Sequence, residues 1–201
     1  MSSDIDGYTG SGSGTLIEEV LVTINGQADL KEMSNVKERF WDMFVIDAFI
    51  GNNDRNNSNW GILKSNDTGN MELAPVFDNG SAFYSKRNID QMEKSIDDET
   101  LMNSDAWKQP TCVYKSIGLD NRVHHVNPYT LIKRGYYDEC NKAVVRFSKK
   151  LNMNKIQKII DEIPEEINGV TVMSDIRKEF YLKIMDIRIN DIFNPIVDKI
   201  L

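Results

Sequence analysis

Three polar side chains in the middle of the chain, Asp54, Asn59 and Asp78, have the types and spacing that phosphoryl transfer requires. Asp54 and Asn59 share one loop, and Asp78 lies in a second loop beyond two short apolar segments. In such a reaction one carboxylate orients the attacking hydroxyl and accepts its proton, while an amide oxygen and a second carboxylate hold a metal ion against nucleotide phosphates. Mg²⁺ suits this set, because it prefers hard oxygen ligands and takes only one or two carboxylates from a protein.

A β-hairpin is predicted between the two loops. The apolar segments 60–64 and 71–76 are separated by the turn-forming run SNDTGN, which is typical of two antiparallel strands joined by a tight turn. A hairpin returns the chain to the place where it began. We therefore expect Asp78 to lie beside Asn59, although 19 positions separate them.

A long helix with a wide apolar face precedes the first loop. Asn35 and Glu38 have the spacing of a capping box at its start, and Gly51 is placed to end it. Its apolar face repeats every four residues, which predicts a central core helix. The repeat consists of Val36, Phe40, Phe44 and Ala48, widened by Trp41, Val45 and Phe49.

The remaining segments predict mostly helix. Shorter helices are expected from about residue 15 to Gly26, from 98 to 107 and from 154 to 163. A longer helix is expected from Pro128 to about Leu151, and a final one begins at a Ser174 cap and is kinked or ended by Pro195. The fold class is mostly α with a small β-hairpin. Residues 1–14, rich in Ser and Gly, read as a flexible leader or linker before a domain over 15–201.

Composition narrows the function classes. The formal net charge of -7 over 201 residues argues against broad binding of nucleic acid or anionic membrane, both of which need clustered cations. Cys112 and Cys140 have no metal-ligand spacing and read as reduced thiols. No apolar run is long enough to span a membrane and no secretory signal is visible, so a cytoplasmic protein is expected.

The same polar residues also allow interpretations other than a phosphoryl-transfer site. A loop rich in Asn and Asp after a helix is often only a turn with self-bonded side chains. A calcium-binding EF-hand starting at Asp54 would need Gly and Glu where Asn59 and Ser65 stand, so that interpretation fails. His124 and His125 are adjacent and point in different directions, which favours a surface role over metal binding.

The runs IGNNDRNNSNWGIL and LAPVFDNGSAF, over about residues 36–84, resemble the catalytic core of the HipA-type Ser/Thr kinases and of phosphatidylinositol 3- and 4-kinases. The resemblance implies the C-terminal helical lobe of a protein-kinase-like fold, with Asp54 as catalytic base and Asn59 and Asp78 as magnesium ligands. It also implies Mg²⁺ and ATP as cofactors, a protein substrate, and a bacterial kinase of the toxin–antitoxin type. The acidic charge makes a lipid substrate the weaker reading.

The chain departs from the pattern of that family in two ways, and it also differs from the Asp-Phe-Gly sequence of kinases. Asn56 stands where the family has a His that braces the loop, and Asn79 stands where the kinase Asp-Phe-Gly sequence has Phe. The residues before the core helix contain no strand, glycine loop, strand and Lys sequence, so the N-terminal lobe is expected to be missing. The run GYTGSGSG at 7–14 is not a phosphate loop, because only six residues precede it and no Gly-Lys-Ser/Thr follows.

Two hypotheses from different classes follow. In the first, the chain is the catalytic lobe of an ATP- and Mg²⁺-dependent Ser/Thr protein kinase, whose nucleotide-binding residues are unknown here and come from a separate N-terminal lobe or an antitoxin-like protein. This kinase contacts neither nucleic acid nor membrane directly. In the second, the chain is a non-catalytic pseudokinase or a helical domain that binds a partner; the missing lobe and Asn56 favour it, whereas the complete set of Asp54, Asn59 and Asp78 opposes it.

Overall fold

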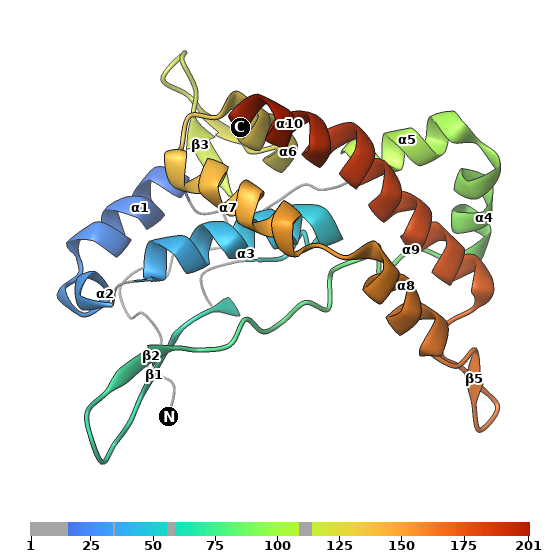
Figure 1. The fold of residues 1–201 in the computed structure, drawn as a ribbon, viewed down its shortest axis with the longest axis horizontal. Helices are drawn as coiled ribbons and strands as arrows, with labels where there is room; N and C mark the ends of the chain where they lie inside the picture. Colours follow the sequence, from blue (N-terminus) through green and yellow to red (C-terminus); the bar gives the residue numbers. More distant parts are fainter. Residues whose placement is uncertain (1–15, 34, 56–58, 109–113) are drawn as a thin grey trace.

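Helices dominate the fold in a computed structural model that describes residues 16–33, 35–55, 59–108 and 114–201. Within these ranges the strands form three separate antiparallel pairs (Figure 1). The predicted class, mostly α with a small hairpin, is therefore confirmed. The proposed leader 1–14, Asn56 and Cys112 lie outside the described residues.

The helices are α1 (Ile17–Gly26), α2 (Ala28–Glu32), α3 (Val36–Ile50), α4 (Ile89–Asp97), α5 (Glu99–Lys108), α6 (Pro128–Arg134), α7 (Asp138–Lys150), α8 (Met153–Glu162), α9 (Asp175–Ile187) and α10 (Asn194–Ile200). The strand pairs are β1 (Ile62–Lys64) with β2 (Met71–Leu73), β3 (Lys115–Ile117) with β4 (Val123–His125), and β5 (Glu166–Ile167) with β6 (Val170–Thr171).

Helix α3 is the predicted core helix, and its apolar face is buried as expected. The predicted capping box at its start is wrong. The Asn35 side chain makes no capping hydrogen bond, and its backbone, at φ -123° and ψ 10°, lacks the extended geometry of a capping residue. The predicted end is confirmed: Gly51 adopts the left-handed conformation at φ 68°, which glycine tolerates best.

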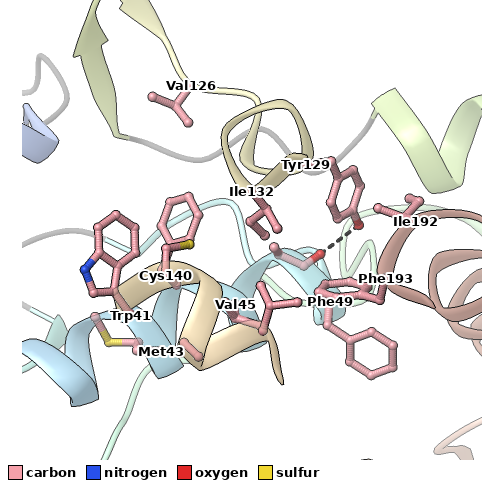
Figure 2. Close-up of a cluster of buried hydrophobic side chains, with 14 of the residues drawn as sticks. Trp41, Met43, Val45, Phe49, Val126, Tyr129, Ile132, Cys140, Ile192 and Phe193 are labelled. Atoms are coloured by element: carbon pink, nitrogen blue, oxygen red, sulfur yellow. Dashed lines mark hydrogen bonds between the residues drawn. The ribbon is translucent and has the colours of Figure 1, made fainter. Parts of the chain in front are cut away.

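Helix α7 packs along α3, and the two form the centre of the core (Figures 1 and 2). The ring of Phe49 on α3 lies 5.0 Å from that of Phe147 on α7, and Phe147 lies 5.1 Å from Phe193. The hydroxyl of Tyr129 on α6 donates to the Ala48 carbonyl at 2.8 Å, the dashed contact of Figure 2. These contacts fix the end of α3 from which the first loop departs.

The helix predicted from Pro128 to Leu151 is two helices, α6 and α7. Gly135 ends α6 in the left-handed conformation at φ 67°, and the amide of Asn141 donates to the Gly135 carbonyl at 3.0 Å. A glycine just past a helix with Lys and Arg in its last turn is the ordinary C-terminal signal. Because apolar residues recur beyond Gly135, the sequence pattern did not predict the break between the two helices.

The described part of residues 85–126 contains more helix and strand than the sequence predicted. Helix α5 confirms the helix expected at 98–107, but α4 and the β3–β4 pair were not predicted. Asn88 and Gln91 form a capping box at the start of α4. That spacing was readable from the sequence, although the helix itself is polar.

The C-terminal helix begins as predicted, with the Ser174 hydroxyl accepting from the Arg177 N–H at 3.4 Å. A π-helical segment, Arg188–Phe193, then joins α9 to α10, so the path continues past Pro195 (Figure 1). Pro195 stands in the first turn of α10, where a missing N–H is tolerated. Within the described residues, no helix is long and apolar enough to cross a membrane.

Candidate functional site

The loop after α3 is held by hydrogen bonds to Asp47, a buried carboxylate on the last turns of that helix. The Asn52 N–H donates to the Asp47 carbonyl at 2.9 Å, and the Asn52 side-chain amide donates to Asp47 Oδ1 at 3.0 Å. The Asp54 N–H in turn reaches Asn52 Oδ1 at 3.4 Å. The backbone at Asn52 and Asp54 is therefore held by hydrogen bonds, while Asp54 itself is exposed to solvent.

The hairpin brings Asp78 to Asn59, as the sequence predicted. Ile62 of β1 pairs with Leu73 of β2, and the Ala74 N–H donates to the Gly61 carbonyl at 2.9 Å, so the chain returns alongside its start. The Asn59 side-chain amide then donates to Asp78 Oδ2. The proximity of these two side chains is thus confirmed, while their role as metal ligands remains a prediction.

Asp78 lies in a left-handed backbone conformation, with φ 58°. Asp is among the few non-glycine residues that adopt this conformation readily. Asn59 is buried, with 4% of its surface exposed, whereas Asp78 is exposed. One partner of the pair is therefore anchored in the protein and the other faces solvent.

Arg55 joins the two loops, a role that was not predicted from the sequence. Its guanidinium forms a bidentate pair with Asp47, with Nε 2.8 Å from Oδ2 and Nη2 3.0 Å from Oδ1. Both side chains are buried, with Arg55 only 1% exposed. A planar guanidinium matches a carboxylate in this geometry, which makes the pair strong and directional.

The remaining donors of Arg55 reach both functional loops. Nη1 donates to the Asn59 carbonyl at 3.2 Å and to the Phe77 carbonyl, and Nη2 donates to Asn79 Oδ1 at 2.5 Å. The contacted groups flank Asp78 on both sides. Arg55 therefore ties the residues around Asp78 to the loop that carries Asp54 and Asn59.

Two sequence signals could have identified this arrangement. Asp47 interrupts the apolar face of a core helix, and a buried carboxylate there requires a cation or several hydrogen-bond donors. Arg55 is the cation in the adjacent loop. The Asn79 that replaces the Phe of the kinase pattern supplies the oxygen that accepts from Arg55.

The Asn59–Asp78 pair fits Mg²⁺ by the chemistry of its donors. An amide oxygen and a carboxylate from touching side chains offer hard oxygen ligands at one place. Over the described ranges, no group of three or more His, Cys, Asp or Glu could hold a metal ion. The protein thus offers a partial coordination shell, which nucleotide phosphates and water complete in phosphotransferases.

A second buried network holds the segment that follows Asp78. The Phe83 N–H donates to the Ile50 carbonyl at 2.9 Å, and the Tyr84 hydroxyl donates to the Asp105 carbonyl at 2.5 Å. Arg188, fully buried, donates to the Tyr84 hydroxyl at 2.8 Å and to the Phe49 carbonyl at 2.6 Å. The end of α3, the segment after Asp78 and the C-terminal helix therefore meet at one guanidinium.

His124 and His125 lie apart from this site, on exposed β4. The His124 ring nitrogen lies 2.9 Å from Asp120 Oδ1, and this hydrogen bond lowers the pKa of the Asp120 carboxyl. The pair is half exposed, which is consistent with the surface role that the sequence favoured.

The architecture is that of a kinase-like helical lobe, and comparisons with known proteins agree with this class. The crystal structure of the Helicobacter pylori proinflammatory kinase CtkA matches 96% of this chain with a TM-score of 0.81 and 30% sequence identity. The match covers 66% of the crystallised CtkA chain.

In sequence, the chain is 33% identical over 178 residues to the serine/threonine-protein kinase CtkA of Helicobacter pylori strain J99, and it is homologous to that protein. The aligned region is 89% of this chain and 51% of CtkA, so the chain spans about half the length of this relative. No protein-family model matches the chain. The narrower resemblance to HipA-type kinases stays a prediction.

Proposed function

We propose that this chain carries the catalytic base and the metal ligands of an ATP- and Mg²⁺-dependent Ser/Thr protein kinase of the HipA type. The observation that supports this most directly is the contact between Asn59 and Asp78 across the hairpin, on loops that Arg55 ties to the Asp54 loop. The homology to CtkA, a serine/threonine-protein kinase, supports the same reaction class.

In the proposed mechanism Asp54 orients the hydroxyl of a substrate Ser or Thr and accepts its proton as the hydroxyl oxygen bonds to the γ-phosphorus and ADP leaves. Asn59 and Asp78 would hold Mg²⁺ through an amide oxygen and a carboxylate, and the ion would neutralise charge on the phosphate oxygens. Asp54 suits this role because it is exposed and its backbone N–H is held by the Asn52 side chain.

We assign no described residue to the binding of the adenine and ribose of ATP. We propose that this part of the site comes from another part of the polypeptide or from a separate protein, such as an antitoxin-like partner. The reaction would take place in the bacterial cytoplasm on a protein substrate. The alternative, a pseudokinase or partner-binding domain, draws on Asn56, which replaces the His of the family pattern.

The test is transfer of labelled phosphate from ATP to the chain itself and to a general protein substrate such as casein, with and without Mg²⁺. It is run with the chain alone and with the polypeptide that supplies the ATP-binding lobe. We expect transfer that needs Mg²⁺ and that falls by about 10²–10⁴-fold in Asp54→Asn, because a general base contributes about that much. Asp67→Asn, an exposed carboxylate on the hairpin turn, is the matched control.

Transfer that persists in Asp54→Asn would remove Asp54 as the base. Absence of transfer in every combination, with a folded chain, would favour the pseudokinase.

A further inference from the structure

A groove of about 660 Å³ lies along α9, between α8 and the α4–α5 pair. Figure 1 shows α8 on one side of α9 and α4 with α5 on the other. The groove floor is apolar and consists of Ile96, Met102, Met153, Leu182 and Ile187. A groove of this size has the volume of a binding site for several side chains.

The floor suits a segment of variable shape. Met102 and Met153 are unbranched and polarizable, so their side chains can adjust to different apolar partners. Met153, Leu182 and Ile187 are half-buried, which leaves apolar surface in contact with solvent. Covering that surface is favourable in proportion to the area removed from water.

Three exposed carboxylates border the groove: Asp97, Glu99 and Asp186. Within the described residues, Asp97 and Glu99 form no ion pair, and Asp186 accepts only an uncharged donor, the amide of Asn190 at 3.0 Å. The one cation at the border, Lys183, is already paired with Glu179 at 2.9 Å. The border thus carries negative charge that nothing described in the chain neutralises.

We propose that this groove docks a basic, aliphatic segment of a partner polypeptide, with apolar side chains on the floor and Lys or Arg side chains on the three carboxylates. Charge complementarity selects this occupant. A second copy of the chain would bring a net charge of -7 to an acidic border, and nucleic acid would be repelled for the same reason. The proposal concerns binding alone and does not depend on the proposed kinase activity.

The position of the groove gives a docked segment a short route to the candidate site. Ile187 on the floor directly precedes Arg188, which donates to the Phe49 carbonyl and to the Tyr84 hydroxyl. A segment docked in the groove would thus lie beside the residue that joins the end of α3 to the segment after Asp78.

The test is fluorescence polarization with a labelled peptide that has two lysines on each side of a Leu-Ala-Leu core, titrated with the full chain. The matched peptide has glutamates in place of the lysines. We expect the lysine peptide to bind and the glutamate peptide not to bind. Binding should weaken when salt is raised, since exposed charge pairs are screened.

Two triple variants with the same change in net charge distinguish binding at the groove from binding that depends only on net charge. Asp97→Asn/Glu99→Gln/Asp186→Asn should weaken binding about tenfold, the combined effect of three exposed charge contacts. The control, Asp67→Asn/Glu166→Gln/Asp198→Asn, changes exposed carboxylates elsewhere and should leave the affinity within about twofold. The unfolding midpoint of each variant checks that the fold is kept.

Equal weakening in both triple variants would overturn the proposal, because binding would then follow net charge alone. So would equal affinity for the two peptides, or no binding at chain concentrations up to about 1 mM. Sedimentation of the unliganded chain tests self-association, and a dimer broken by the groove variant would overturn the choice of occupant.

Discussion

At the scale of single residues, Arg55 connects the parts of the candidate site, because its guanidinium contacts both loops. Its neighbour Asp54 faces solvent, whereas Arg55 is buried and bonded to Asp47, Asn59 and Asn79. The Asn59–Asp78 pair and the loop that carries Asp54 are therefore held by a side chain that is itself buried. Its effect on activity should run through the placement of Asp78.

Loss of Asn79 should loosen Asp78 without disturbing the buried ion pair. Asn79→Ala removes the acceptor of Arg55 Nη2 and leaves both Asp47 contacts intact. We expect stability to fall by about 1 kcal/mol, the worth of one hydrogen bond. The Mg²⁺ concentration that gives half-maximal phosphate transfer should rise several-fold, because Asp78 directly precedes the freed residue.

The measurement is phosphate transfer as a function of Mg²⁺, with Asn70→Ala on the exposed hairpin turn as the matched control. An Asn79→Ala protein with the wild-type Mg²⁺ requirement would show that this contact does not position Asp78.

Arg55 itself should contribute strongly to stability. Arg55→Met leaves the Asp47 carboxylate buried without its partner, and breaking a buried ion pair from one side costs about 3–5 kcal/mol. The double variant Asp47→Leu/Arg55→Met removes both charges and should be more stable than Arg55→Met alone. Urea unfolding of the two proteins measures the difference; a double variant less stable than the single one would contradict this reading of the pair.

At the scale of elements, the end of α3 depends on Gly51. Its φ of 68° disfavours most residues that have a Cβ, and a Cβ there would lie 3.1 Å from Arg188 Nη1. Gly69, on the hairpin turn, has nearly the same conformation at φ 71° with nothing within 4 Å of an added Cβ. Substitution of Gly69 therefore tests backbone strain alone, whereas substitution of Gly51 tests strain together with a steric contact.

We expect Gly69→Ala to cost about 1–2 kcal/mol, the penalty of the left-handed conformation for a residue with a Cβ. Gly51→Ala should cost more, because it also displaces the guanidinium that bonds to the Phe49 carbonyl. Free energies of unfolding in urea provide the comparison. Equal losses in the two variants would mean that Arg188 moves aside without penalty.

The elements that local pattern determines were predictable from the sequence. The apolar repeat of α3, the turn between β1 and β2 and the Ser174 cap are all encoded within a few residues. The proximity of Asn59 and Asp78 followed from the hairpin alone. The break between α6 and α7 was missed because apolar periodicity resumes after Gly135 and hides the change of direction.

The supporting contacts were not predictable in the same way. The Asp47–Arg55 pair requires the left-handed turn at Gly51 to bring residues eight positions apart together. The contact of Arg188 with the Phe49 carbonyl joins residues 139 positions apart, and no periodicity encodes such a distance. The sequence pattern therefore predicted the candidate site residues, while the contacts that hold their loops depend on tertiary packing.

At the scale of the whole molecule, Tyr84 links three parts of the chain. It follows the Asp78 loop, donates to the Asp105 carbonyl on α5 and accepts from Arg188 in the π-helical segment. Burial raises the pKa of Tyr84 from 10.0 to about 12, although the Arg188 guanidinium acts in the opposite direction. The folded protein therefore disfavours the phenolate more strongly than the unfolded chain does.

The raised pKa of Tyr84 makes the stability of the protein fall at alkaline pH. A raised folded-state pKa contributes stability that is complete below the unfolded value of 10.0 and is lost as the pH rises toward about 12. Tyr84→Phe should be less stable than the wild type at neutral pH, because it loses both hydrogen bonds. Its stability should then fall less steeply above about pH 10, since one titrating group has been removed.

The measurement is the free energy of unfolding of both proteins in urea from about pH 8 to about pH 11. Burial also raises the pKa of Tyr129 above its usual range, so the variant should retain part of the decline. A gap between the two proteins that narrows with rising pH would place Tyr84 among the groups that couple the Asp78 loop to the C-terminal helix. Parallel curves would assign the alkaline loss to other groups, and the link through Arg188 would then contribute packing alone.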